Sequence, residues 1–450
     1  MKVHPHDLLI QELFSASGED DQAVLDHVIR CGRCQRRARS LLHAKPDPLV
    51  DKVVWLDLRL PQPADHTFAV ERSLARASSL LAFYEEEKAE AVGLLPELLE
   101  HPAGRRCWIL RNHRRFQTWG LFELLLERSR DQSFQDAAQA EEMALLALEI
   151  PDRLEDFDDE RLEDMRARAL ACVGNARRVQ SDLRGAEEAF SVAFSHLSRG
   201  TRDPMERAVL LDLKASLRRA QGRFTEAYRL LHRAVFLFRQ LGERHLAGRS
   251  LVNMAIVLRY AGEPSRAIPL LHQALELIDP AREPRLLLFT WNNLIDDLAE
   301  NGQFMEAQGL LARARPLYRQ FPQPWIQNRR KWVEGRIARG LGQRGQAETL
   351  FLEARDGFLL EGAAYDTALV SLDLAYFYAE QGRMAELKNV AEEMVPIFSS
   401  RQIHREALAA LAFWRQAVEA ERVGVDLVMS VASFLKRARH DPELRFQQPE

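Results

Sequence analysis

The sequence feature that most constrains the fold is a glycine that returns every 40 residues. Five glycines keep this spacing without a deviation: Gly222, Gly262, Gly302, Gly342 and Gly382. Self-similarity at a fixed period of roughly 20–50 residues is typical of repeat proteins, in which similar units stack one after another. The spacing therefore predicts a linear array of units rather than one central core.

Small residues share the register of the glycines. Seven residues before each glycine stand Ala215, Ala255, Ile295, Gly335 and Ala375. Five residues after each glycine stand Ala227, Ala267, Ala307, Ala347 and Leu387. Apolar residues recur at i, i+3, i+4 and i+7 along most of the chain, which is the spacing of amphipathic helices. We expect each unit to be two antiparallel helices that approach closely at the small residues, with the glycine at positive φ in the turn between them.

The same register continues upstream with one extra residue. The equivalent positions there are Gly174, Ser181, Ala186, Phe190 and Ala193. A further unit is expected over 116–148, where the register is ambiguous. The last repeat loses the alanines, as terminal repeats often do.

A small residue in the first helix, a glycine turn and alanines in the second helix resemble the tetratricopeptide repeat, in a form longer than the usual ~34 residues. The resemblance covers roughly residues 105–420. It implies an all-α fold, a right-handed superhelical solenoid of about six or seven helix pairs. Such solenoids are general scaffolds for binding peptides and proteins, so the resemblance alone does not name a partner.

Charge and hydropathy exclude several classes of function. Basic and acidic residues nearly balance, 62 against 66, with a formal net charge of −4. General nucleic-acid binders are usually strongly basic, so we do not expect nucleic acid as a partner. No apolar run approaches the ~18 residues of a membrane span, and no apolar signal core opens the sequence. We expect a cytoplasmic protein without a membrane partner.

Residues 27–34 have the spacing of metal ligands. They read His27-x3-Cys31-x2-Cys34, so the three side chains share one face of a helix. Imidazole and thiolate ligands suit tetrahedral Zn²⁺, and His4 or His6 is available as the fourth ligand. The alternatives are a chance pair of cysteines and a redox Cys-x-x-Cys, which is disfavoured because no β-α-β pattern surrounds it.

The run from His4 to Cys34 resembles the zinc-containing anti-sigma factors over about residues 4–45. Carried over by position, His4 is the fourth zinc ligand and His6 its alternate. The resemblance implies a zinc helix hairpin that packs against a sigma factor and holds it inactive, under the control of a fused sensor domain. The predicted organisation is then a zinc-binding unit (1–45), a Pro-containing linker (46–65), the solenoid (66–440) and a polar tail (441–450).

A candidate binding groove follows from the same register. In tetratricopeptide-repeat proteins the first helix of each pair lines the groove, and we expect six side chains of this chain to face it: Arg219, Arg259, Arg329, Trp332, Arg336 and Arg339. Such a cationic and aromatic patch suits an acidic peptide or a carboxylate. The neighbouring helix offers Asn292 and Asp296 but not the lysines of the carboxylate clamp in chaperone-binding relatives, so chaperone binding is not inferred. A solvated groove without a dedicated ligand is the alternative.

No catalytic constellation is evident. Gly340, Gly342 and Gly345 match G-x-G-x-x-G, but an expected helix precedes them where a dinucleotide site needs a strand. Cys107 and Cys172 lie on apolar helical faces and are expected in the core. We therefore expect a non-enzymatic protein. Either it is a regulator whose zinc unit binds a sigma factor or another transcription component, or it is a scaffold for a signalling or defence complex with a purely structural zinc unit.

Overall fold

The computed structural model describes residues 67–133, 135–155, 157–394, 405–419, 424–438 and 445–446. Within these ranges the regular structure is helical and no strand occurs. The chain divides into two compact units, residues 1–78 and 79–450. None of the helices in the described ranges combines the length and the apolar character needed to cross a bilayer.

The second unit is built from helical hairpins, most of them between 14 and 21 residues per helix. The part before the 40-residue register contains α4 (Thr67–Glu100), α5 (Ala103–Asn112), η2 (Arg114–Phe116), α6 (Trp119–Gln132), α7 (Ala137–Leu148) and η3 (Pro151–Arg153). The pairs that follow are α8 (Asp159–Val179) with α9 (Leu183–Arg199), α10 (Pro204–Ala220) with α11 (Phe224–Gln240), α12 (Arg244–Tyr260) with α13 (Pro264–Leu277), and α14 (Pro284–Glu300) with α15 (Phe304–Arg319). The last described pairs are α16 (Pro324–Gly340) with α17 (Arg344–Leu360), α18 (Ala364–Glu380) with α19 (Met384–Glu393), and α20 (Arg405–Glu419) with α21 (Val425–Ala438).

The predicted turn glycines are confirmed. All five of the register have positive φ, between 68° at Gly382 and 83° at Gly262. At each of them the N–H one residue after the glycine reaches back to the carbonyl four residues before it, as in Arg223 to Arg218 at 2.8 Å and Gln343 to Ala338 at 2.9 Å. This six-to-one hydrogen bond closes the end of the first helix and turns the chain into the second.

The small residues lie where the two helices of a pair meet. Ala215, Ala255 and Ala375 are almost fully buried. At Gly335 even a methyl group has no room, because a Cβ there would stand 2.9 Å from the ring of Phe351 on α17. Close approach at these positions is what lets each pair bury its alanines, and the prediction of facing small residues is confirmed.

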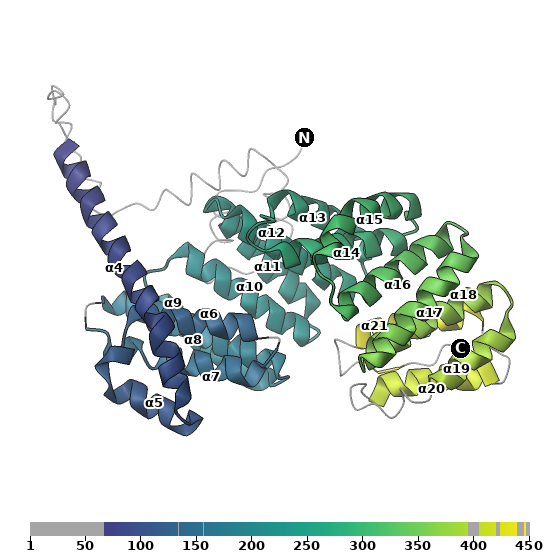
Figure 1. Ribbon diagram of the computed structural model, residues 1–450, viewed down its shortest axis with the longest axis horizontal. Helices are drawn as coiled ribbons and strands as arrows, with labels where there is room; N and C mark the ends of the chain where they lie inside the picture. Colours follow the sequence, from purple (N-terminus) through teal and green to yellow (C-terminus); the bar gives the residue numbers. More distant parts are fainter. Residues whose placement is uncertain are drawn as a thin grey trace, which may run out of the picture. The chain divides into compact units, whose positions relative to one another are not determined.

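The pairs stack in sequence order, as the repeat predicted. Each second helix packs against the first helix of the next pair, for example α11 on α12 and α17 on α18. Figure 1 shows the resulting series of antiparallel hairpins from α8 to α18. The core is accordingly a string of local clusters, such as the one from Ala215 to Ile337 and the one from Trp332 to Ala438. The all-α solenoid fold is thereby confirmed.

One feature of the stacking was not predicted. Gly242 and Gly362 also have positive φ, in the turns that lead from one pair to the next. The upstream turn of α8 has a serine in this conformation, Ser181, with φ 67°. The expected unit over 116–148 is the pair α6 and α7, which packs against α8.

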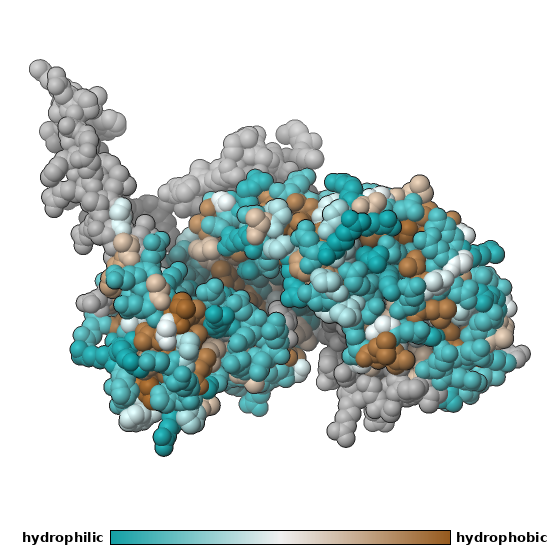
Figure 2. All heavy atoms as spheres, viewed as in Figure 1, coloured by the Kyte–Doolittle hydropathy of each residue, from teal (hydrophilic) through white to brown (hydrophobic). Residues whose placement is uncertain are grey.

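The first helices of successive pairs form one continuous surface, which we call the A-helix face: α8, α10, α12, α14, α16 and α18. In the view of Figure 2 the molecular surface is mostly hydrophilic, with hydrophobic residues in small groups. Charged side chains on the A-helix face therefore decide what it can bind.

Candidate functional site

The six predicted groove residues all lie on the A-helix face. Arg219 is on α10, Arg259 is on α12, and the other four are on α16. Arg219, Arg259 and Arg339 each precede a turn glycine by three residues, so they occupy equivalent positions in their repeats. They do not form a simple cationic patch, because some of these side chains are already paired with carboxylates.

A chain of buried ion pairs joins four first helices. Arg259 contacts Asp296 on α14 at 2.7 Å, and Asp296 contacts Arg336 on α16 at 2.6 Å. Arg336 continues to Asp373 on α18 at 2.6 Å, and the indole N–H of Trp332 donates to the same carboxylate at 2.6 Å. Charge-assisted bonds of this length fix the helices in register. We call Arg259, Asp296, Arg336, Asp373 and Trp332 the ionic relay.

The relay leaves two of the predicted arginines without capacity for an external anion. Arg259 also lies 3.0 Å from Asp297, and Arg336 stacks over the ring of Trp332 at 4.5 Å. Burial pushes the pKa of Asp296 up, but Arg336 and Arg259 together hold it well below its usual range. Asp296 is therefore ionised, and it neutralises the arginines on both sides of it.

Asp297, the next residue in the sequence, has a raised pKa where that of Asp296 is lowered. Its side chain is fully buried and neither of its carboxyl oxygens accepts a hydrogen bond within the described structure. Burial raises the pKa of Asp297 to about 8, with Asp296 and Glu300 adding to the rise and Arg259 opposing it. This carboxyl group is therefore mostly protonated at neutral pH.

Arg219, Arg329 and Arg339 form no ion pair with any carboxylate in the described ranges. Arg339 lies over the ring of Tyr376 at 4.4 Å, and Arg219 over the ring of Tyr260 at 5.6 Å. Arg329 is half-buried. Cation–π contacts hold the first two guanidinium groups in place without a direct ion pair.

Arg178 on α8 is a site residue that the sequence interpretation missed. It precedes the Ser181 turn by three residues, so it is the equivalent of Arg219 one repeat earlier. Its guanidinium donates to the side-chain oxygen of Asn175 at 2.8 and 3.2 Å. Burial and the neighbouring charge of Arg219 lower the pKa of Arg178 to about 10. The available signal was the register itself, which already placed Ser181 at the turn position, but the equivalent of Arg219 was not read off it.

Arg178 and Arg219 thus form a like-charged pair on α8 and α10. We call them the arginine pair. No carboxylate contributes to the shifted pKa of Arg178, in contrast to Arg259 and Arg336 on the later helices. Two adjacent cations in a partly desolvated place are stabilised by an anion that binds both. Guanidinium groups hold carboxylate and phosphate oxygens through paired hydrogen bonds.

A cavity of about 280 Å³ opens near the N-terminal halves of α8 and α10. Its lining includes Tyr84 and Trp119, whose rings lie 4.4 Å apart, together with Arg168 and Glu206. Arg168 is already held by Glu123 through two hydrogen bonds of 2.6 and 2.7 Å. Burial raises the pKa of Glu206. The other cation of its lining, Arg161, lies 3.8 Å from Asp158, so we do not assign this cavity to the anion site of the arginine pair.

The predicted zinc ligands His4, His27, Cys31 and Cys34, and the alternate His6, lie outside the described residues. Within the described part of the chain no group of three or more metal-binding side chains occurs. Cys172 is buried, as predicted for a core residue, and burial raises its pKa. Cys107 is half-buried, and burial raises its pKa too. Neither thiol has the depressed pKa of a nucleophile.

Comparison with known proteins agrees with the fold. The tetratricopeptide repeat family matches residues 206–279, which cover α10 to α13. No curated protein sequence matches the chain.

Solved structures of similar fold extend the likeness beyond these two pairs. A Rap protein, solved in complex with competence and sporulation factor, is 14% identical to this chain, covers 69% of it and 85% of its own length, and has a TM-score of 0.52. Aspartyl phosphate phosphatase F from Bacillus subtilis is 11% identical, with 89% of this chain and 96% of its own covered and a TM-score of 0.49. At these identities the first likeness establishes a shared solenoid fold and nothing further.

Proposed function

We propose that this chain, a tetratricopeptide-like solenoid, is a non-enzymatic regulator in the cytoplasm that acts by binding other proteins. The solenoid docks a protein or peptide partner on its A-helix face. The N-terminal residues 1–45 bind Zn²⁺ and, through that unit, a sigma factor or another transcription component.

The observation that carries the first half of the proposal is the arginine pair. Arg178 and Arg219 are adjacent cations without a carboxylate partner, while Arg259 and Arg336 further along the same face are neutralised by aspartates. A partner with an acidic segment or a terminal carboxylate supplies the missing charge. The Rap protein of similar fold was solved with competence and sporulation factor bound, which supports a solenoid of this kind as a receptor for a ligand.

The second half of the proposal rests on the spacing of His27, Cys31 and Cys34 and on the resemblance to zinc-containing anti-sigma factors. In this arrangement the zinc unit holds the transcription component and the solenoid senses the signal. Because metal binding and folding are coupled in such small units, loss of zinc is expected to abolish binding of that partner.

The docking site is tested with a fluorescently labelled hexaglutamate peptide and the full chain. We expect saturable binding that weakens with added salt, and at least a tenfold loss of affinity in the double variant Arg178→Gln/Arg219→Gln. The matched control is Arg184→Gln/Arg344→Gln, which removes two exposed arginines at the starts of α9 and α17. Equal affinity of the two double variants would disprove the assignment of the arginine pair.

The zinc unit is tested by affinity purification of the full chain from its native host, with zinc determination and proteomics. The wild-type chain and the variant Cys31→Ser/Cys34→Ser are compared. We expect about one zinc per chain and a sigma factor with the wild type, and neither with the variant.

The second candidate function is a scaffold that assembles a signalling or defence complex, with the zinc unit purely structural. It is favoured because the arginine pair belongs to the unit 79–450, which does not include the predicted zinc ligands. Under this function the Cys31→Ser/Cys34→Ser variant retains all partners of the wild type and no transcription protein is captured. The same purification therefore distinguishes the two functions.

A further inference from the structure

The last described helix departs from the repeat. In the preceding pairs the second helix packs between its own first helix and the next pair. α21 instead packs against α18, the first helix of the previous pair, as well as against its own partner α20. The ammonium group of Lys436 near its end contacts Glu300 at the end of α14 at 2.6 Å, although the two residues are 136 positions apart. α21 therefore lies on the A-helix face and extends from α18 to α14.

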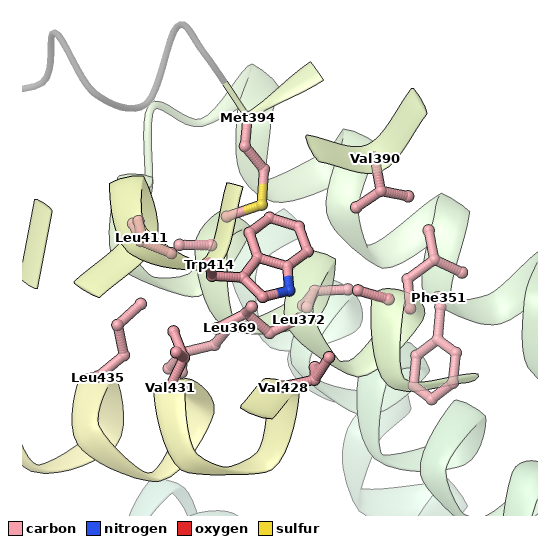
Figure 3. Close-up of a cluster of buried hydrophobic side chains, with 14 of the residues drawn as sticks. Phe351, Leu369, Leu372, Val390, Met394, Leu411, Trp414, Val428, Val431 and Leu435 are labelled. Atoms are coloured by element: carbon pink, nitrogen blue, oxygen red, sulfur yellow. The ribbon is translucent and has the colours of Figure 1, made fainter. Parts of the chain in front are cut away.

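The contact with α18 is made by an apolar stripe. Val428, Val431, Leu435 and Ala438 recur at intervals of three and four residues and are fully buried. Figure 3 shows Val428, Val431 and Leu435 of this stripe below the indole of Trp414, beside Leu369 and Leu372 of α18, with Met394 on the other side of the ring. A helix of 14 residues is about 21 Å long, enough to cross neighbouring helices spaced 8–10 Å apart.

The charges of α21 complement the A-helix face at both of its ends. At the C-terminal end Lys436 lies on Glu300, and its charge also lowers the pKa of Asp296 and Asp373. The acidic groups there outnumber the arginines of the ionic relay, so Lys436 supplies a cation that the face lacks. At the N-terminal end the charge of Asp426 acts on Tyr376, over which Arg339 stacks.

We propose that α21 is an internal ligand of the A-helix face, which covers the section from α14 to α18 and is displaced by a partner helix of the same design. That helix carries apolar residues at i, i+3 and i+7, an acidic residue in its first turn and a basic residue in its last turn. This inference goes beyond the proposed function, because it concerns a different section of the face from the arginine pair and a ligand of mixed charge. Binding of such a helix releases α21.

The first experiment measures binding in trans. A chain that ends at residue 423 is titrated with a synthetic peptide of residues 424–440, and its far-UV circular dichroism is compared with that of the full chain. We expect the shortened chain to bind the peptide at least tenfold more tightly than the full chain, whose site is occupied. The peptide with Lys436→Glu is expected to bind about tenfold more weakly, and the peptide with Arg437→Glu as well as the wild type. Arg437 is the matched control because it is exposed.

The second experiment uses the full chain and does not require the shortened chain to fold. Lys436→Glu is expected to accelerate amide hydrogen exchange across residues 425–438, whereas Arg437→Glu is expected to leave the exchange rate unchanged. The charge-reversed double variant Glu300→Lys/Lys436→Glu is expected to restore protection against exchange. Equal exchange in the two single variants, or a well-folded shortened chain that ignores the peptide, would overturn the proposal. Hexaglutamate binding at the arginine pair is unaffected by any of these changes, so failure here is distinguishable from failure of the proposed function.

Discussion

At the scale of single residues, Asp296 of the ionic relay and its sequence neighbour Asp297 have pKa values shifted in opposite directions. Asp296 lies between Arg259 and Arg336 and stays ionised, whereas burial raises the pKa of Asp297 to about 8. In the unfolded chain an aspartate has a pKa of about 3.9. Between these two values the folded chain holds a proton that the unfolded chain has lost. The free energy of unfolding therefore falls as pH rises from about 4 to about 8, by at most ~1.4 kcal/mol per pH unit.

The variant Asp297→Asn tests whether the free energy of unfolding falls with rising pH because of this residue. Its amide keeps the shape of the protonated carboxyl group but cannot ionise, so the variant should be more stable than the wild type by roughly 1–3 kcal/mol at pH 9 and equal to it near pH 4. Urea unfolding at both pH values measures the difference. Asp296→Asn is the contrasting change: it leaves Arg259 and Arg336 without their shared partner and should cost about 3–5 kcal/mol at neutral pH. Parallel pH profiles for wild type and Asp297→Asn would contradict the raised pKa.

At the scale of elements, the pair of α16 and α17 contains two glycines with different physical demands. A Cβ at Gly335 would meet the ring of Phe351 at 2.9 Å, whereas a Cβ at Gly342 would meet nothing within 4 Å. The restriction at Gly342 is its φ of +76°, which is unfavourable for residues with a side chain. One position is limited by packing and the other by backbone conformation.

Gly335→Ala should destabilise the chain by about 1–3 kcal/mol through overpacking. Because the clash is with a side chain, adding Phe351→Leu should return part of this loss of stability. A double-mutant cycle of the wild type, the two single variants and the double variant measures the interaction energy between the two changes. Strictly additive effects of the two changes would show that the aromatic ring is not what excludes the methyl group.

Gly342→Ala should cost about 1–2 kcal/mol, the price of a left-handed conformation for alanine. Gly342→Asn should cost less, because asparagine tolerates that conformation better. The midpoint of urea unfolding ranks the three chains. An alanine variant as stable as wild type would contradict the role of this turn.

The helical pairs also show how much of the fold and of the candidate site could be predicted from the sequence. A strict 40-residue spacing determines the turns, the small facing residues and the stacking, because these are local demands repeated in every pair. The ionic relay depends on which carboxylate points between adjacent helices, and one sequence does not reveal that choice. Arg178 could have been predicted, because the register had already assigned the turn position to Ser181, three residues after it. The position of α21 was missed because its amphipathic pattern is that of an ordinary second helix, and only its contacts with α18 and Glu300 reveal the departure.

At the scale of the whole molecule, stability is distributed along the solenoid. Successive buried clusters cover Ala91–Ala189, Ala215–Ile337 and Trp332–Ala438, and each draws on a few neighbouring helices. In such arrays the free energy of folding is close to a sum of local terms. A perturbation confined to residues 1–78 should therefore leave the unfolding of the unit 79–450 nearly unchanged.

Removal of zinc from the full chain tests this independence. If His27, Cys31 and Cys34 hold Zn²⁺, a chelator should release about one equivalent and unfold the small N-terminal unit, since folding and metal binding are coupled there. The main thermal transition, followed by far-UV circular dichroism, should keep its midpoint within about 2 °C, because these ligands belong to the unit 1–78 and the stability of the solenoid is close to a sum of local terms. The variant Cys31→Ser/Cys34→Ser should behave as the chelated wild type does, with no further response to the chelator. A fall of several degrees in the main transition on zinc removal would mean that the N-terminal unit supports the solenoid directly, and would favour the structural role of zinc that belongs to the scaffold function.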